Sequence, residues 1–428
     1  MHVLEITRAG EAVLAEMLRR RHLEEEETAA GVAAIVRDVR ERGDAAVLEY
    51  TLRFDGVALT ETRVPAEELA AAWRDLAPEL KEALMRAAGA VEAFHRRQLE
   101  RSWFVTGPDG EVTGQLVAPL SRVGVYVPGG RAAYPSSVLM NVLPAKVAGV
   151  PEIAMVTPPG KDGRVDSSVL AAAYLAGVTE VHRVGGAQAV AALAYGTAGI
   201  RPVDKITGPG NVYVTAAKKQ VFGRVGIDMP AGPSEVVVVG DGSQPAPWAA
   251  ADLLAQAEHD PGAWAVVVTP DEGWAQAVRE AVLRAAASLP RREVVTAALR
   301  DHGRILLTRD MPEAMAVAGR LAPEHLELLV AEPLAWLGRV RNAGAVFLGG
   351  RAPVAVGDYL AGPNHVLPTG GTARFCSPLG VYDFVRRTGM VYYTPAALTR
   401  DAPAVAALAR REGLEAHARA VETRGATT

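Results

Sequence analysis

Gln256 and His259 lie three residues apart in a stretch that reads as the last turns of a helix beginning near Pro247. Residues at this spacing project from one face of a helix, so an amide oxygen and an imidazole can both reach a single ion. An ordinary polar pair at the end of a helix has the same pattern and is the commoner case. The choice between the two therefore depends on other residues.

A second pair that could do chemistry is Glu324-His325, which directly follows Pro323. Proline disfavours helical geometry in the residue before it, so this segment predicts the end of one helix and a defined direction for the pair. A carboxylate beside an imidazole supplies two proton acceptors near neutral pH. An exposed charged pair remains the alternative interpretation.

Two later segments carry further candidates. Residues 357–370 include Asp358 and His365 but show little periodicity. They predict a long loop, and a loop of that length in a compact chain usually has a function. Residues 411–417 end at His417, with Gly413 expected to break one helix and let another begin.

These candidates must be positioned by strand-like and helical segments that alternate along the chain. Such alternation predicts parallel sheets with helices on their faces. The region from Glu11 to Arg101 is expected to be mainly helical, with His95 on a solvated face. The expected strands are 123–127, 153–157 and 180–184 in one set, and 236–239, 264–269, 305–308, 326–330 and 345–348 in another.

Glycine-rich segments follow three of the expected strands, at Tyr126–Gly130, Val184–Gln188 and Thr207–Asn211. Ligands of open α/β sheets bind outside such carboxyl ends, and a helix amino terminus there favours phosphate oxygens. None of the three has the G-x-G-x-x-G spacing of the usual dinucleotide fingerprint. Plain turns are the commoner explanation for glycines at strand ends.

Composition narrows the class of protein. The chain has 428 residues, 49% of them hydrophobic, and a net charge of −4 from 45 basic and 49 acidic residues. It is expected to fold into two or more domains, without a general cationic surface for nucleic acid or an anionic membrane. Cys376 is the one cysteine, so no intrachain disulfide forms. No signal peptide or spanning segment is visible, and a cytoplasmic location is expected.

Together these segments resemble the histidinol dehydrogenase family over nearly the whole chain. The matching segments occur in the expected order and are Ile227–Glu235, Glu258-His259, Pro323–His325, Gly357–Tyr359, Gly362–Pro368 and Glu412–His417. The resemblance implies oxidation of L-histidinol to L-histidine through a bound L-histidinaldehyde, with NAD and one zinc ion. It also implies an α/β fold of two incomplete Rossmann-like parallel-sheet domains, plus small N-terminal and C-terminal helical segments.

The resemblance also implies a role for each matching residue. His325 is expected to take the proton from the alcohol, Glu324 to activate water, and His365 to lie near the reacting carbon. The implied zinc ligands are Gln256, His259, Asp358 and His417, a set of imidazole and oxygen donors that suits Zn²⁺. The implied substrate contacts are these four residues with Ser234, His325 and Glu412, and the implied NAD contacts are Tyr126, Gln188 and Asn211.

The predicted division of the chain places residues 1–21 in an N-terminal helical segment and residues 381–428 in a C-terminal dimerisation segment. Residues 22–125 and 236–380 form a discontinuous first α/β domain, and residues 126–235 form the second. From the residues alone, His417 can reach its own sheet or a partner's. Since the family forms an intertwined homodimer, the resemblance implies that His417 and Glu412 complete the neighbour's site.

Two other classes remain open at this point. A zinc hydrolase of a small amino or imidazole substrate would use the same kind of ligands with Glu324 as general base, and it would act without NAD. A metal-dependent binding protein would have no need of the Glu324-His325 pair. Cys376 is a possible nucleophile in principle, but its neighbours supply no base, so it is interpreted as structural.

Overall fold

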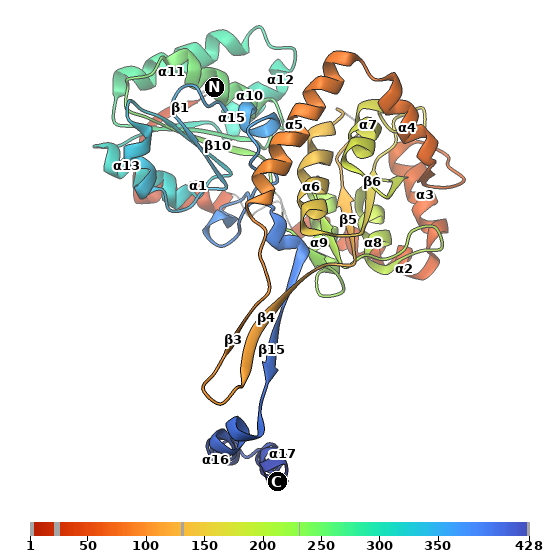
Figure 1. Ribbon diagram of the computed structural model, residues 1–428. Coiled ribbons are helices and arrows are strands. Elements are labelled where there is room, and N and C mark those ends of the chain that lie inside the picture. Colours follow the sequence, from red (N-terminus) through yellow and green to blue (C-terminus); the bar gives the residue numbers. More distant parts are fainter. Residues whose placement is uncertain (1–3, 21–25, 130–131, 231, 426–428) are drawn as a thin grey trace.

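The computed structural model describes residues 4–20, 26–129, 132–230 and 232–425. Gly130 and Ala231, which belong to two of the predicted segments, lie outside this part. The described chain forms a body with two six-stranded sheets and an arm that extends away from it (Figure 1). The α/β class with two parallel-sheet units, predicted above, is confirmed.

The first sheet, called sheet A, is parallel throughout and has the order β1-β12-β11-β10-β13-β14. Successive valines of β10 alternate between two buried clusters, one under each face, which explains why the strand is an unbroken valine run. The strands are β1 (Glu5–Arg8), β10 (Glu235–Gly240), β11 (Trp264–Thr269), β12 (Arg304–Leu307), β13 (His325–Leu329) and β14 (Ala345–Leu348). One face packs on α10 (Ala246–Ala257), α11 (Glu272–Ala286) and α12 (Arg292–Asp301), the other on α1 (Glu11–Arg20) and α13 (Met311–Leu321).

The second sheet, called sheet B, has the order β2-β7-β6-β5-β8-β9 and is parallel except for β2. Its strands are β2 (Arg63–Val64), β5 (Arg122–Tyr126), β6 (Glu152–Thr157), β7 (Glu180–Arg183), β8 (Lys205–Thr207) and β9 (Gly226–Ile227). One face packs on α4 (Ala66–Asp75), α5 (Pro78–Arg96), α6 (Pro135–Ala148) and α7 (Ser167–Ala176). The other packs on α2 (Glu26–Arg42), α3 (Asp44–Asp55), α8 (Gly186–Tyr195) and α9 (Val212–Val221).

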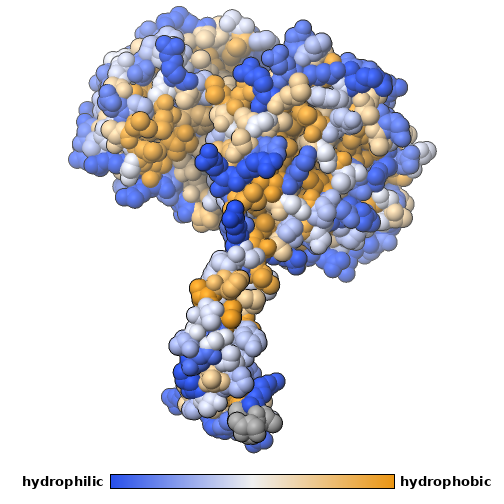
Figure 2. All heavy atoms as spheres, in the orientation of Figure 1, coloured by the Kyte–Doolittle hydropathy of each residue, from blue (hydrophilic) through white to orange (hydrophobic). Residues whose placement is uncertain are grey.

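The arm is a three-stranded antiparallel sheet with β4 in the middle, and it ends in two packed helices. Figure 1 shows these helices and the C-terminus at its far end, away from the body. Figure 2 shows apolar side chains along its surface, and Trp103, Phe104 and Val391 are each more than half exposed. The elements are β3 (Trp103–Thr106), β4 (Val112–Pro119), β15 (Val385–Tyr392), α16 (Pro395–Arg411) and α17 (Glu415–Gly425).

The packing differs from the predicted division of the chain. Residues 22–125 were assigned to the first α/β domain, but helices α2 to α5 cover sheet B, and β5 is one of its central strands. The N-terminal segment is also not separate, because β1 pairs with β12 at an edge of sheet A. The physical reason is that an amphipathic helix reveals a buried stripe in its sequence but not the surface that covers it.

Within the described residues, no helix combines the length and the apolar character needed to cross a membrane.

Candidate active site

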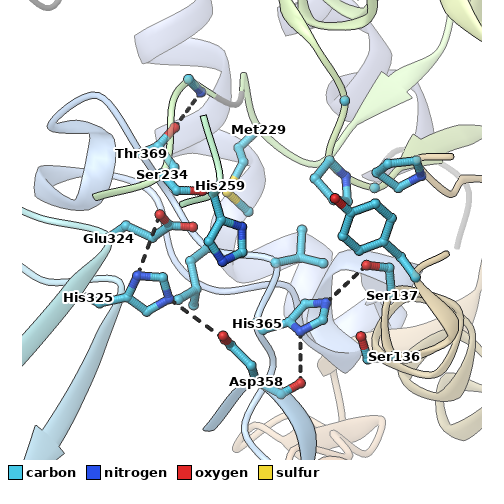
Figure 3. Close-up of a pocket in the computed structure, with 18 of the residues that line it drawn as sticks. Ser136, Ser137, Met229, Ser234, His259, Glu324, His325, Asp358, His365 and Thr369 are labelled. Atoms are coloured by element: carbon cyan, nitrogen blue, oxygen red, sulfur yellow. Dashed lines mark hydrogen bonds and ion pairs between the residues drawn. The ribbon is translucent and has the colours of Figure 1, made fainter. Parts of the chain in front are cut away.

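A cavity of about 250 Å³ lies where the carboxyl edge of sheet B meets the amino edge of sheet A. Gly208 and Asp228 come to it directly after β8 and β9, whereas Ser234 and Glu324 come to it directly before β10 and β13. The two sheets thus present opposite strand ends to one pocket. Seven of the predicted site residues line it, several of them drawn in Figure 3: Ser234, Gln256, His259, Glu324, His325, Asp358 and His365.

His325 is the first residue of β13 and is buried. Its Nδ1 lies 2.9 Å from the backbone oxygen of Glu235, which can only accept a hydrogen bond, so Nδ1 carries the hydrogen. Its Nε2 then has a free lone pair, and within the described chain this buried atom has no hydrogen-bond partner. Burial lowers the pKa of His325 to about 4, helped by the nearby His365 and His259. The ring is therefore a neutral base at neutral pH.

Glu324 lies directly before β13 and is held from β10. Its Oε2 accepts a hydrogen bond of 2.9 Å from the backbone N–H of Glu235, and the carboxylate of Glu235 accepts one from the N–H of Glu324 at 3.4 Å. Burial raises the pKa of Glu324 well above its usual value, although the N–H of Glu235 opposes the shift. The residues predicted to be proton acceptors are thus both buried at the pocket, and the exposed-pair alternative is wrong.

Gln256, His259 and Asp358 reach the pocket from two helices. Gln256 is in the last turn of α10, and His259 lies just past that helix, with its ring in the pocket (Figure 3). Asp358 was expected in a loop, but it belongs to a short helix, α15 (Val354–Tyr359). The proline and small residues at the start of α15 hid it, because six residues are too few to show helical periodicity.

The chemistry of these donors suits a divalent cation. Asp358 is three-quarters buried, and burial raises its pKa to about 6. In the described chain, no lysine or arginine pairs with it, and its one ion-pair neighbour is Nε2 of His325 at 3.9 Å. A buried carboxylate without a counter-charge is unfavourable, and a metal ion would relieve it. The described residues contain no cluster of three or more His, Cys, Asp or Glu side chains that could hold a metal alone.

His365 has both ring nitrogens engaged. Nδ1 donates to the backbone oxygen of Asp358 at 2.9 Å, and Nε2 lies 3.3 Å from Oγ of Ser137 in the first turn of α6. Burial lowers its pKa to about 4. The ring therefore links the end of α15 to α6, across the pocket between the two sheets (Figure 3).

His417 and Glu412 do not line the pocket. Both are exposed on the helices at the end of the arm, Glu412 directly after α16 and His417 on α17. The strand β15 carries these helices eight residues out from the body, which is about 26 Å at 3.3 Å per residue. A single chain thus brings together three of the four predicted zinc ligands and leaves the fourth at the end of the arm (Figure 1).

The predicted NAD contacts all lie at the carboxyl edge of sheet B. Tyr126 ends β5 and its hydroxyl oxygen accepts a hydrogen bond of 3.1 Å from the N–H of Gly186, at the start of α8. Gln188, in the same turn of α8, is buried, and its Oε1 has no partner in the described chain. Asn211 is exposed and caps α9. A neighbouring cavity of about 590 Å³ shares Pro128 with the pocket.

Sequence reasoning missed a buried ion pair in the pocket wall. Lys218 of α9 pairs with Asp228 and donates to the backbone oxygen of Gly208 at 2.9 Å. Asp228 in turn accepts from the N–H of Gly208 at 2.8 Å, so the pair fixes the turn that lines the pocket. The available signal was a lysine inside the partly apolar helical stretch Val212–Val221.

Two further residues of the sequence analysis have clear positions. Cys376 does not line the pocket but packs against the core beside sheet B, and burial raises the pKa of its thiol. That environment fits the structural interpretation. His95 is fully buried, so the prediction of a solvated face is wrong. Its ring lies 3.3 Å from the side-chain nitrogen of Asn364, which steadies the loop that carries His365.

Comparison with known proteins decides the family. The family model described as histidinol dehydrogenase matches residues 18–425. The chain belongs to the histidinol dehydrogenase family. It is 55% identical to the histidinol dehydrogenase of Moorella thermoacetica over 406 residues, which make up 94% of this chain and 96% of that protein. The histidinol dehydrogenase of Rhizobium meliloti is 54% identical over 401 residues, covering 93% of this chain and 92% of that one.

A solved structure supports the same assignment. The histidinol dehydrogenase of Elizabethkingia anophelis superposes with a TM-score of 0.94 at 34% sequence identity, over 99% of this chain and 98% of that one. Membership of the histidinol dehydrogenase family makes the chain an oxidoreductase of histidine biosynthesis.

Proposed function

We propose that the chain oxidises L-histidinol to L-histidine in two hydride transfers to NAD, through a bound L-histidinaldehyde. The observation that carries the proposal is the free lone pair of His325 Nε2, buried in a pocket beside Glu324 and the metal-type donors. A base of this kind is needed to remove the hydroxyl proton as hydride leaves the carbon. Family membership favours this reaction over the hydrolase alternative.

His325 is the base for the alcohol. Its hydrogen bond to the backbone of Glu235 fixes the tautomer and the direction of the ring, which leaves Nε2 free as the proton acceptor. Because its pKa is about 4, the ring is neutral before the alcohol binds and can accept the hydroxyl proton as hydride leaves. Glu324 then takes a proton from the water that adds to the aldehyde carbon. His325 serves again in the second oxidation.

Zinc is proposed to be held by Gln256, His259 and Asp358 with His417, and when bound it supplies a Lewis-acidic anchor for the amino and imidazole groups of histidinol. Ser234 at the start of β10 and Glu412 are proposed to bind the substrate. His365, with both ring nitrogens in contacts, orients Asp358 and lies next to the proposed position of the reacting carbon.

NAD, when bound, accepts the hydride, and Tyr126, Gln188 and Asn211 would hold it. Support comes from their common position at the carboxyl edge of sheet B, where glycines follow the strands. Tyr126 also accepts a hydrogen bond from the N–H of Gly186, so it would hold NAD together with the turn at the start of α8. The cavity that shares Pro128 with the pocket provides room at the same edge.

We propose that the active form is a homodimer in which each arm reaches the partner's body. The exposed His417 and Glu412, the apolar side chains along the arm and the incomplete ligand set in one chain support this arrangement. A second copy related by a two-fold axis would supply the missing ligand at both sites.

The test is the yield of NADH per L-histidinol at limiting substrate, on protein stripped of metal and then reloaded with zinc. The expected yield is about two NADH per substrate, and only after reloading, since each oxidation transfers one hydride. A yield near one would remove the second oxidation and the role of Glu324 from the proposal. Full activity without metal would overturn the zinc site.

A further inference from the structure

Two carboxyl groups that play no part in the mechanism lie behind the pocket, one buried and one half-buried. Glu327 of β13 is 1% exposed, and its Oε1 accepts a hydrogen bond of 3.1 Å from the backbone N–H of Val354. Its Oε2 is buried and has no donor among the described residues. The carboxyl group of Asp252, on α10, lies within hydrogen-bonding reach of Glu327. Neither carboxyl lines the pocket.

Ionisation of both groups is disfavoured in this environment. Burial and then the neighbouring Asp252 raise the pKa of Glu327 well above its usual value, and burial raises that of Asp252. Two carboxyls so placed titrate as a coupled pair, and burial favours the state with one proton between them. A shared proton also supplies the donor that Oε2 of Glu327 otherwise lacks.

The positions of Asp252 and Glu327 along their helix and strand relate the pair to the active site. Asp252 lies four residues before Gln256, on the same face of α10. Glu327 lies two residues after His325, and alternate residues of a strand share a face. Val354 is the first residue of α15 and lies four residues before Asp358. Asp252 and Val354 are therefore one helical turn from a site residue, and Glu327 is two strand positions from one.

We propose that Asp252 and Glu327 are a positioning pair, joined by one shared proton, that fixes Gln256, His325 and Asp358 relative to one another. The pair ties α10, β13 and α15 together at the level next to the pocket. Apolar side chains of similar volume would stabilise the fold at least as well, but hydrogen bonds also set direction, which metal ligands and a catalytic base require. The zinc-related part of this inference rests on the proposed function.

The experiment compares Glu327→Leu with Glu327→Gln in the full-length protein. Glutamine can accept from the N–H of Val354 and donate to Asp252, so it should keep zinc affinity and kcat close to the wild type. Leucine removes both hydrogen bonds, and we expect zinc affinity, measured by competition with a chelator, and kcat to fall by about 10–100-fold. The KM for NAD should not change, because sheet B is untouched.

A matched control is Glu180→Leu, which removes a buried carboxyl at the far edge of sheet B. It should lower the unfolding midpoint yet leave kcat and zinc affinity unchanged, which separates positioning from general destabilisation. If Glu327→Leu does not fold, Asp252→Ala and Asp252→Asn test the same contact from the half-buried side. Wild-type behaviour of Glu327→Leu, or equal damage by leucine and glutamine, would overturn the inference. Wild-type protein that needs no zinc would instead overturn the proposed function.

The shared proton has its own signature. In the folded wild type, Glu327 stays protonated at pH values at which it loses its proton in the unfolded chain. The wild type therefore loses stability as the pH rises above the ordinary pKa of a glutamate. Among the described residues, Asp252 is the charged group that acts on Glu327. The unfolding midpoint of Glu327→Gln relative to the wild type should therefore rise between about pH 5 and 8. A difference in unfolding midpoint that stays constant with pH would contradict the shared proton.

Discussion

Glu324 and His325 are neighbours in the chain, and burial drives both toward their neutral forms at neutral pH. For His325 the neutral form is the base, and it is ready before substrate arrives. For Glu324 the neutral form is the acid, which must lose its proton before it can activate water. Of the two residues, only His325 is therefore a base in the form that burial favours, and Glu324 must be ionised when water adds to the aldehyde.

This difference predicts separate effects for the two residues. Glu324→Gln keeps the hydrogen bond to the N–H of Glu235 but cannot accept a proton, so oxidation of L-histidinaldehyde should slow by about 10²–10⁴-fold. Oxidation of L-histidinol to the aldehyde should continue. His325→Gln should slow both. The measurement is single-turnover NADH formation from each substrate supplied alone. Equal slowing of both substrates by Glu324→Gln would contradict the assignment.

Seven of the residues that line the pocket could be predicted from the sequence, because motif order and family resemblance identify them one by one. Glu235, Ser137 and the Lys218–Asp228 pair could not. Ser137 and Glu235 are defined by partners far away in the chain: Ser137 meets a residue 228 positions later, and Glu235 meets one 89 positions later. Spacing within a segment carries no information about such partners.

At the scale of elements, an ion-pair network closes the edge of sheet B opposite the pocket. Glu180 at the start of β7 contacts Arg122 of β5, Arg63 of β2 and the buried His182. Burial alone would raise the pKa of Glu180, but hydrogen bonds from His182 and Arg122 outweigh it and lower the pKa to about 2. The network ties three strands together across this edge.

The network predicts a specific acid sensitivity. Because the folded pKa of Glu180 lies below its unfolded value, the stability it contributes is complete above about pH 4.3 and is lost as pH falls toward 2. The loss is on the order of 3 kcal/mol. Glu180→Gln should be less stable at pH 7 and should lose less further stability in acid, measured by urea unfolding at several pH values. Parallel acid profiles for the two proteins would contradict this.

The strands were easier to predict than their partners. The valine run of β10 and the glycine turns after β5, β7 and β8 are local signals, and the structure confirms them. The assignment of α2 to α5 failed because their apolar stripes fit either sheet. The two-residue strand β2, which pairs with β7, is too short to leave a pattern in the sequence.

At the scale of the whole molecule, the arm makes the proposed site divisible between two chains. A subunit with His417→Ala lacks the zinc ligand that it would contribute to its partner's site. A subunit with His325→Gln lacks the base of its own site. Each variant alone should be inactive, but a mixed dimer would contain one site with both defects and one intact site. Co-expression with two affinity tags isolates that dimer.

Random association makes half of the dimers mixed, so an equal mixture should recover about a quarter of the wild-type activity per site. The purified mixed dimer should recover about half. No recovery would show that His417 serves its own chain. Unmixed His417→Ala with normal activity would remove His417 from the zinc site.

The arm also sets the order in which the chain can fold. Its middle strand, β4, pairs on one side with β3, its near neighbour in sequence, and on the other with β15, which enters after both large sheets are complete. The contact of Arg387 with Glu100 spans 287 positions. Closing so long a loop is slow, so during synthesis one edge of β4 stays open until the last part of the chain emerges. The hairpin of β3 and β4 is therefore exposed to aggregation in the nascent protein until β15 arrives.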